Sequence, residues 1–420
     1  MINIYNYISK KGWIFFQLGI FLLLSAPTIG AFFLILSLVS THLNKQISQI
    51  KKKWIIPFFI SGLVAIISSL FLSIRSNELD GWDSSLSWIG LMNWIPFFYF
   101  MWRSQFYLNT PEKRQKVGDI FLAGSVPLIL SGFSQVWLNW NGPFVFMNGL
   151  IIWFQRSIDF NKGDGMTAMF NNQNYAAAWL IIVWPFCIYS FLNIKKMNFK
   201  KLISFFLMIL LAICIYLTQS RNAILSTLLS SFFIIDKIYL LITISSLFVI
   251  LLLSNKLFNL QYLNLLEILN FSKILNEPRV YIYLNALPII FERPFLGWGA
   301  ASFSFIFKLR NPGFNREPTH AHNLIFEMAN SYGILFSLLI SLTILLILFF
   351  SYKIIFLENF SMNSLKTKNN LSFDKAWWSS FFALSFSQMY DIQYFDFRIS
   401  VSFWILLTGL VCIIQKNFFK

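Results

Sequence analysis

Charged residues are scarce in this sequence. Only 12% of the residues are Asp, Glu, Lys or Arg, whereas an average soluble domain has roughly 25%. Hydrophobic residues make up 57% of the chain, and 50 of them are Phe. A soluble fold cannot cover so much apolar surface, so the composition excludes an ordinary soluble protein and is typical of a protein built into a lipid bilayer.

Cysteines are few, and nucleotide-binding motifs are lacking. The three cysteines, Cys187, Cys214 and Cys412, all lie inside apolar runs, which argues against a disulfide framework or a cysteine-based metal cluster. The connections between these runs contain no Walker A motif, no glycine-rich dinucleotide fingerprint and no Gly-x-Ser-x-Gly turn. The sequence therefore argues against ATP-driven transport and ordinary serine hydrolysis.

Positive charge is abundant, but it follows the topology of a membrane protein. The formal net charge is +16, which alone would suit a nucleic-acid partner. The lysines, however, lie mostly in short connections between apolar runs, and the connections 42–53, 103–117 and 194–201 each hold four Lys or Arg. This is the pattern of cytoplasmic loops. We therefore expect no nucleic-acid partner and place these connections, with both chain termini, in the cytoplasm.

The apolar runs predict an all-α, polytopic integral membrane protein with about twelve transmembrane helices, forming one membrane domain over residues 1–420. The first run, 13–41, would measure roughly 43 Å as one helix, against a hydrocarbon core of ~30 Å. It has Pro27 in its middle, so we predict two helices there. The other candidate spans are 54–74, 86–102, 118–138, 175–193, 202–217, 223–235, 238–254, 334–357, 376–390 and 399–415.

Two predicted outer segments are longer than simple turns. Residues 139–174 are rich in aromatic residues, Gly and Asn, and residues 255–333 form a loop of 79 residues between the ninth and tenth predicted spans. Loops of this length in a compact protein are usually functional. We expect 255–333 to be one large periplasmic loop that carries part of a functional site.

Arginine and lysine are sorted differently across the predicted membrane. Eight of the ten Arg fall on the outer side, but only four of the 23 Lys do. The eight are Arg75, Arg156, Arg221, Arg279, Arg293, Arg310, Arg316 and Arg398. A guanidinium group binds phosphate oxygens in a bidentate manner and keeps its proton. The sorting predicts an anionic, phosphorylated ligand on the outer side, with pairing to lipid phosphates as the alternative.

His322 is the first candidate for chemistry, since it lies shortly before the apolar run that begins at 334. A histidine at the water–membrane boundary can act as a general base near neutral pH. The alternative is a structural histidine bonded to a backbone carbonyl. His320 and His322 together raise the question of zinc, but no Cys or close third ligand joins them in the sequence, so we predict no metal site.

Charged side chains at two other outer turns complete the candidate set. Arg221 and Arg279 each begin an apolar segment, and an Arg at the edge of the hydrocarbon is costly unless it snorkels or meets an anion. Asp391, Asp396 and Arg398 lie in the last outer turn. They either orient a base and bind sugar hydroxyls or form a local salt bridge of little energetic weight.

Several of these segments together resemble the O-antigen ligase / O-antigen polymerase superfamily, over most of residues 140–415. They are Thr218-x-Ser220-Arg221-x-Ala223, the run from Arg279 through Pro288 to Gly299, His322-Asn323 followed by Gly333 after nine residues, Asp391 to Arg398, and the Asn-rich stretch 165–174. Phe336 stands where members of the family often have a second Gly, and the choice between ligase and polymerase stays open.

The resemblance implies a metal-independent membrane glycosyltransferase without a cofactor, acting in lipopolysaccharide or polysaccharide biosynthesis at the bacterial inner membrane. It implies transfer of a glycan from a polyprenyl-pyrophosphate carrier, of the undecaprenyl type, to a hydroxyl of a glycan, lipid or protein acceptor in the periplasm. Arg221 and Arg279 match the two arginines thought to hold the pyrophosphate, and His322 matches the histidine thought to activate the acceptor. The family's acidic residue falls on Asp391 or Asp396.

A membrane transporter of bicarbonate or of a lipid-linked sugar is the alternative function. Transporters usually show repeat symmetry and carry ionisable residues near the bilayer midplane. In this sequence no internal repeat stands out, and the charged residues gather at the predicted outer edge. That distribution favours an enzyme.

Overall fold

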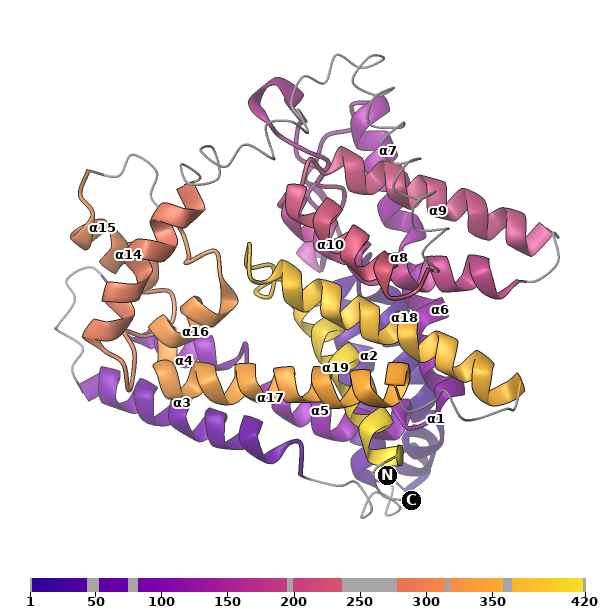
Figure 1. Ribbon diagram of the computed structural model, residues 1–420, viewed down its shortest axis with the longest axis horizontal. Helices are drawn as coiled ribbons and strands as arrows, with labels where there is room; N and C mark the ends of the chain where they lie inside the picture. The colour runs from indigo at the N-terminus through magenta and orange to yellow at the C-terminus, as the bar shows by residue number, and fades with distance from the viewer. Residues whose placement is uncertain are drawn as a thin grey trace.

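The computed structural model describes residues 2–43, 53–74, 82–194, 199–235, 278–313, 318–357 and 365–417. This part of the chain is mainly helical (Figure 1). The helices are α1 (Ile2–Leu22), α2 (Pro27–Leu43), α3 (Ile56–Ile74), α4 (Ser85–Leu91), α5 (Ile95–Leu108), α6 (Pro111–Gly124), α7 (Val126–Trp137), α8 (Gln173–Asn193), α9 (Phe199–Leu217), α10 (Arg221–Phe232), α14 (Pro278–Glu292), α15 (Phe303–Arg310), α16 (Leu324–Tyr332), α17 (Ile334–Tyr352), α18 (Leu365–Ser387) and α19 (Phe397–Asn417).

Six helical segments of the described chain are long and apolar enough to cross a membrane. They are Ile56–Ile74, Pro111–Trp137, Gln173–Asn193, Phe199–Leu217, Ile334–Leu357 and Phe397–Lys416, and each overlaps one of the predicted spans. The predicted span 238–254 lies outside the described residues. A polytopic helical architecture is therefore confirmed, whereas the total of about twelve spans stays a prediction.

The N-terminal apolar run folds into two helices, as Pro27 predicts. Helix α1 ends at Leu22 and α2 begins at Pro27, and the two pack along each other. Proline can begin a helix, because the first turn leaves its backbone N–H groups without helical partners, but it cannot continue one. The apolar parts of both helices, Lys11–Leu22 and Pro27–Thr41, are shorter than a full span.

The run 86–102, predicted as a single span, is instead broken into α4 and α5, with a turn at Met92–Trp94. Pro96 lies in the first turn of α5, so the same rule that explains Pro27 applies here. The break places Trp94 against Tyr394 of the last outer turn and against Phe336 near the start of α17.

The outer segment 139–174 contains a small β-hairpin, which the all-α prediction did not include. Strand β1 (Phe144–Phe146) pairs antiparallel with β2 (Ile151–Trp153), with Phe144 opposite Trp153. Asn148 and Gly149 in the connecting turn both have positive φ, 54° and 91°. Asn-Gly flanked by apolar residues is a strong hairpin signal, because both residues adopt this conformation at low cost.

Helices α8, α18 and α19 form the centre of the bundle, and α3, α9 and α17 lie at its periphery. Most of α8 and nearly all of α19 are buried, whereas most of α3, α9 and α17 is not. Trp179, Trp377 and Trp404 are the largest fully buried side chains, one from each central helix. Exposed apolar residues on the peripheral helices, such as Leu63 and Phe349, suit contact with lipid tails.

The described part of the segment 255–333 folds into the helices α14, α15 and α16. They gather beside the end of α3, at the left of Figure 1, and α16 contacts both α14 and α3. Gly333 links α16 to α17 with a φ of +90°, and a Cβ there would lie 2.1 Å from the carbonyl oxygen of Phe295. Only glycine fits this close contact with the backbone of Phe295. This explains why the His-Asn-x9-Gly spacing ends in a glycine.

Candidate functional site

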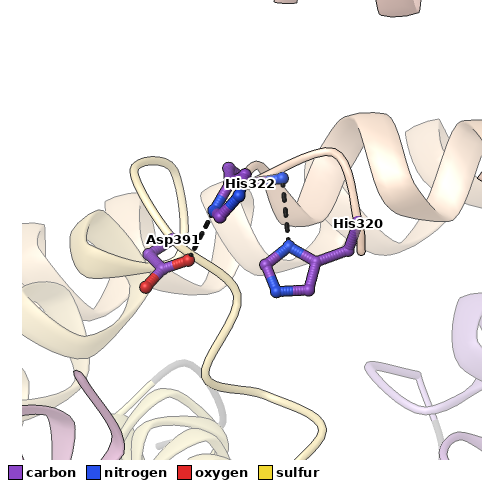
Figure 2. A group of neighbouring side chains, drawn as sticks. All are labelled: His320, His322 and Asp391. Carbon is purple, nitrogen blue, oxygen red and sulfur yellow. Dashed lines mark hydrogen bonds and ion pairs between the residues drawn. The ribbon is translucent and has the colours of Figure 1, made fainter. Parts of the chain in front are cut away.

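His322 and Asp391 form a hydrogen-bonded pair at the centre of the candidate site. His322 Nδ1 lies 2.8 Å from Asp391 Oδ1, although the residues are 69 positions apart in the chain (Figure 2). His322 comes from the loop before α16, and Asp391 from the turn between α18 and α19. The histidine side chain is 26% exposed and the carboxylate 9%, so the imidazole is the part of the pair that a substrate can reach.

The surroundings keep Asp391 ionised at neutral pH. Burial acts to raise the pKa of this carboxyl, but the hydrogen bond from His322 and the charges of His322 and Arg279 outweigh it and hold the pKa below its usual value. Asn174 Nδ2 donates to Asp391 Oδ2 at 2.6 Å, and the backbone N–H of Ile392 donates to Oδ1 at 3.1 Å. An ionised carboxylate only accepts hydrogen bonds. The proton between the two side chains therefore belongs to His322 Nδ1, so Nε2 is the ring nitrogen that remains to exchange a proton with a substrate.

The backbone around His322 is held in a strained conformation by the end of α18. His322 has a φ of +50°, a left-handed conformation that costs a non-glycine residue about 1–2 kcal/mol. The N–H of Leu324 donates to the carbonyl of Gln388 at 3.0 Å, and Asn323 Nδ2 donates to the carbonyl of Met389 at 3.1 Å. Such strain persists only where the surrounding contacts fix it, and it is common at functional sites.

Helix α14 adds a tyrosine and an arginine from one face. The Tyr283 hydroxyl lies 3.0 Å from the carbonyl oxygen of His322 and 3.1 Å from that of Met389, so it bridges the two loops that form the site. Arg279 precedes Tyr283 by four residues and therefore shares its face of the helix. Its charge acts on Asp391, His320 and Tyr283. A half-buried guanidinium group thus lies close enough to the His322–Asp391 pair to act on it electrostatically.

Arg221 begins α10, whose start is fixed to the same end of α18. The Ser220 side chain caps the helix by accepting from the N–H of Ala223 at 3.4 Å. Asn222 Nδ2 donates to Ser387, at 2.8 Å from its Oγ and 3.0 Å from its carbonyl oxygen. Arg221 itself is exposed. The start of α10 is therefore anchored to Ser387, four residues before Asp391. Arg221 and Asp391 thus belong to one end of the bundle, although they are far apart in sequence.

Asp396 and Arg398, the other candidates from the last outer turn, pair with each other. Arg398 donates to both carboxylate oxygens of Asp396, at 2.9 and 2.6 Å. Its guanidinium group also lies 3.7 Å from the centre of the Phe170 ring and donates to the carbonyl of Met169. Within the described residues this pair fastens the start of α19 to the segment 165–174. Of the two acidic candidates, Asp391 is the one in contact with His322.

His320 joins His322 and Asp391 in a group that has the residue types of a metal site. One ligand atom from each residue lies within 4.8 Å of the others. The sequence prediction that no close third ligand joins the two histidines is thus corrected, because Asp391 arrives from a distant turn. Burial first, and then the nearby charge of His322, lower the pKa of His320 to about 4. His320 is therefore neutral at pH 7, and its Nδ1 accepts from the N–H of His322 at 3.3 Å.

Glu327 is a buried carboxyl in α16 that the sequence analysis did not single out. It is 4% exposed, and its Oε2 accepts a hydrogen bond from the N–H of Ala321 at 2.9 Å. Burial raises the pKa of Glu327 to about 7, against the lowering effect of this bond. The residue lies within the nine positions between Asn323 and Gly333, on the side of α16 that also carries Ser331 and Tyr332.

The raised pKa of Glu327 predicts a dependence of stability on pH. Between its ordinary value of 4.5 and about 7, the folded chain binds more protons than the unfolded chain, so the free energy of unfolding falls as pH rises through this window. We expect Glu327→Gln to flatten that fall, as measured by thermal unfolding of the detergent-solubilised protein at pH 5 and pH 7.5. An equal change between the two pH values in the variant and the natural chain would contradict this assignment.

Asn174 and Tyr283 are further site residues whose roles the sequence analysis did not assign. Asn174 lies in the Asn-rich stretch 165–174 noted from the sequence, two residues after Asn172, which caps α8. Tyr283 lies four residues after Arg279 on an apolar segment with helical periodicity, and this spacing was the one sequence feature that linked it to a candidate residue. Neither signal points to Asp391 or His322 without the tertiary structure.

A comparison with protein families gives one match, to the family described as O-antigen ligase, over residues 206–341. Among curated proteins no sequence matches this chain. The matched region includes Arg221, Arg279 and His322, whereas Asp391 lies beyond its end. Together with the apolar helices, the match supports a bacterial integral membrane protein with a role in glycosyl transfer, which involves a lipid-linked glycan and an acceptor. The resemblance of this chain to the O-antigen ligase / O-antigen polymerase superfamily is thus confirmed over residues 206–341.

Proposed function

We propose that this protein transfers a glycan from a polyprenyl-pyrophosphate carrier to an acceptor hydroxyl at the periplasmic face of the bacterial inner membrane, with both chain termini in the cytoplasm. The observation that carries the proposal is the His322–Asp391 pair beside Arg279, inside or next to the region that matches an O-antigen ligase. A base and a fixed cation at one site are the two elements that such a transfer requires.

The proposed reaction uses His322 as the base and Asp391 as the group that orients it. His322 Nε2 removes the proton of the acceptor hydroxyl while the acceptor oxygen forms a bond to the anomeric carbon of the donor glycan. The bond between that carbon and the pyrophosphate oxygen breaks, and polyprenyl pyrophosphate leaves with the electron pair. Asp391 accepts the Nδ1 hydrogen throughout, so it keeps the imidazole oriented and stabilises the imidazolium that forms.

Arg279 and Arg221 are assigned to the pyrophosphate. Negative charge builds up on the leaving group as the glycosidic bond breaks, and fixed cations near it lower the barrier. Arg279 already acts electrostatically on the His322–Asp391 pair, and Arg221 begins a helix anchored four residues before Asp391. Both side chains are accessible at least in part, as a group that binds a substrate must be.

An apolar cavity beside the site suits the polyprenyl chain of the carrier. It has a volume of about 220 Å³ and is lined by α16, α17, α18 and α19, including Leu324, Leu345 and Phe403. Leu324 and Ile325 in its wall follow His322-Asn323 directly, and Met389 in the same wall lies two residues before Asp391. If the apolar tail of the carrier binds here, its pyrophosphate end lies near the two loops that carry His322 and Asp391.

Metal-independent chemistry is part of the proposal, and the geometry of the pair supports it. Ligands of a tetrahedral zinc ion, each at about 2.0–2.1 Å from the metal, lie roughly 3.3–3.4 Å apart. His322 Nδ1 and Asp391 Oδ1 are 2.8 Å apart, the length of a charge-assisted hydrogen bond. A metal ion between them would have to displace this hydrogen bond.

Arg279→Lys is expected to slow glycan transfer about 10-fold or more, although it keeps the positive charge. An ammonium group cannot reproduce the bidentate contact of a guanidinium group with phosphate oxygens. The measurement is transfer in vesicles that contain the purified protein, a lipid-linked glycan and its acceptor. Arg310→Lys is the matched control, since Arg310 lies in the same segment but pairs with Glu292 at an exposed position. Natural rates for Arg279→Lys would mean that positive charge alone suffices there.

A further inference from the structure

A second cavity lies on the other side of α16, and its wall is more polar than that of the apolar cavity. It has a volume of about 240 Å³, and Met328 borders both cavities. Its wall includes Glu327, Ser331 and Tyr332 from α16, Thr319 and His320 from the preceding loop, and Phe395 from the last turn. Helix α16, which begins directly after His322-Asn323, therefore separates an apolar cavity from a polar one.

Two polar groups in this wall have no partner within the described chain. The hydroxyl of Tyr332 is buried without a hydrogen bond. Glu327 uses Oε2 to accept from Ala321, whereas its Oε1 has no hydrogen-bond partner among the described residues. Tyr332 and Glu327 are 1% and 4% exposed, and the charge of Glu327 acts on Tyr332. Leaving the buried Tyr332 hydroxyl unpaired costs about 1–3 kcal/mol, so it calls for a ligand, and Glu327 Oε1 offers that ligand a second polar atom in the same cavity.

From this arrangement we infer that the polar cavity binds one sugar ring of a saccharide substrate, with Glu327 and Tyr332 bonding its hydroxyl groups. This inference rests on the proposed function and names the substrate part that the site beside His322 recognises. Sugar hydroxyls both donate and accept hydrogen bonds, so they fit a carboxyl oxygen and a phenol side by side. Phe395, 39% exposed at the rim, offers an aromatic face to the C–H groups of the ring.

The position of the cavity places that sugar next to the reacting centre. His320 lines the cavity, and its ring lies 4.4 Å from the ring of His322, centroid to centroid. His320 therefore borders the cavity and also lies beside the proposed base, His322 (Figure 2). The saccharide can be the end of the acceptor or the first sugar of the donor, since both present the same hydroxyl chemistry.

Tyr332→Phe tests the inference most cleanly, because a structural role and a binding role predict opposite results. Removing an unpaired buried hydroxyl should leave thermal stability unchanged or raise it. The binding role predicts that the variant holds the oligosaccharide released by mild acid from the source strain's own polysaccharide about 10-fold more weakly. Binding is measured by calorimetry on the purified protein in detergent. Tyr352→Phe, at the far end of α17, is the matched control and should bind normally.

Kinetics with Glu327→Gln and Tyr332→Phe then assign the source of the sugar. A KM that rises about 10-fold for the acceptor places the acceptor sugar in the cavity, and the same rise for the donor places the donor sugar there. Natural KM values for both substrates, with natural oligosaccharide binding, would overturn the inference. His322→Ala in the same binding assay separates the two proposals: it should bind the oligosaccharide normally, so a failure of the transfer chemistry does not count against the sugar site.

Discussion

Replacing His322 with Ala is expected to slow glycan transfer by about 10²–10⁴, the usual contribution of a general base, while the protein stays folded in the membrane. The imidazole is the accessible member of the pair with Asp391, and within the described residues its ring contacts Asp391 and the ring of His320. The measurement is the rate of transfer per molecule of protein in reconstituted vesicles, with abundance measured in parallel.

His320→Ala is the control for this experiment. It removes the neighbouring ring of the same loop, which accepts a hydrogen bond from the backbone of His322 but makes none to Asp391 in the described structure. We expect a smaller loss of rate, because the base and its orienting carboxylate both remain. Equal losses in the two variants would indicate a damaged loop, and full activity of His322→Ala would exclude a base at this position.

Asp391→Asn is expected to lower the rate by a similar 10²–10⁴ without a large loss of folded protein. The carboxamide is neutral, so it stabilises an imidazolium poorly and can hold the ring in the wrong tautomer. The same change in Ser-His-Asp triads costs about 10⁴. Asn174 donates to Oδ2 and Ile392 to Oδ1, so the single amide oxygen of the variant keeps one of these two bonds. The measurement is kcat at saturating donor and acceptor.

Asp396→Asn is the matched variant, five residues later in the same turn. Asp396 pairs with the buried Arg398, and removing one partner of a buried pair leaves an uncompensated charge. We therefore expect a loss of folded protein with near-natural activity per remaining molecule. The reverse pattern, in which Asp396→Asn loses activity and Asp391→Asn does not, would show that the acidic residue has been assigned to the wrong position.

The helices could be predicted largely from the sequence because their signals are local. The apolar run 175–193 corresponds to α8 (Gln173–Asn193), and the run 334–357 begins at the residue where α17 begins. Pro27 marked the break of the first run correctly. Pro96 and the Asn148-Gly149 dipeptide carried equally local information on the break before α5 and on the hairpin, so these two features were predictable in principle.

The site was only partly predictable, because its decisive contacts join distant parts of the chain. His322, Arg221 and Arg279 stood out by residue type and position. Asp391 and Asp396 could not be told apart, since they lie in one turn and only the tertiary structure shows which carboxylate meets His322. Glu327 gave no signal at all, because its significance depends on burial and on the cavity that α16 borders.

We propose that glycan transfer occurs at the His322–Asp391 pair, and a stoichiometric assay is the sharpest test of this proposal. The purified protein is reconstituted in vesicles with a polyprenyl-pyrophosphate-linked glycan and an acceptor, with and without a chelator of divalent metals. We expect one free polyprenyl pyrophosphate for each glycosylated acceptor, at rates that the chelator leaves unchanged and His322→Ala nearly abolishes. Movement of the intact lipid-linked glycan across the bilayer without release of the carrier, or turnover abolished by the chelator, would contradict it.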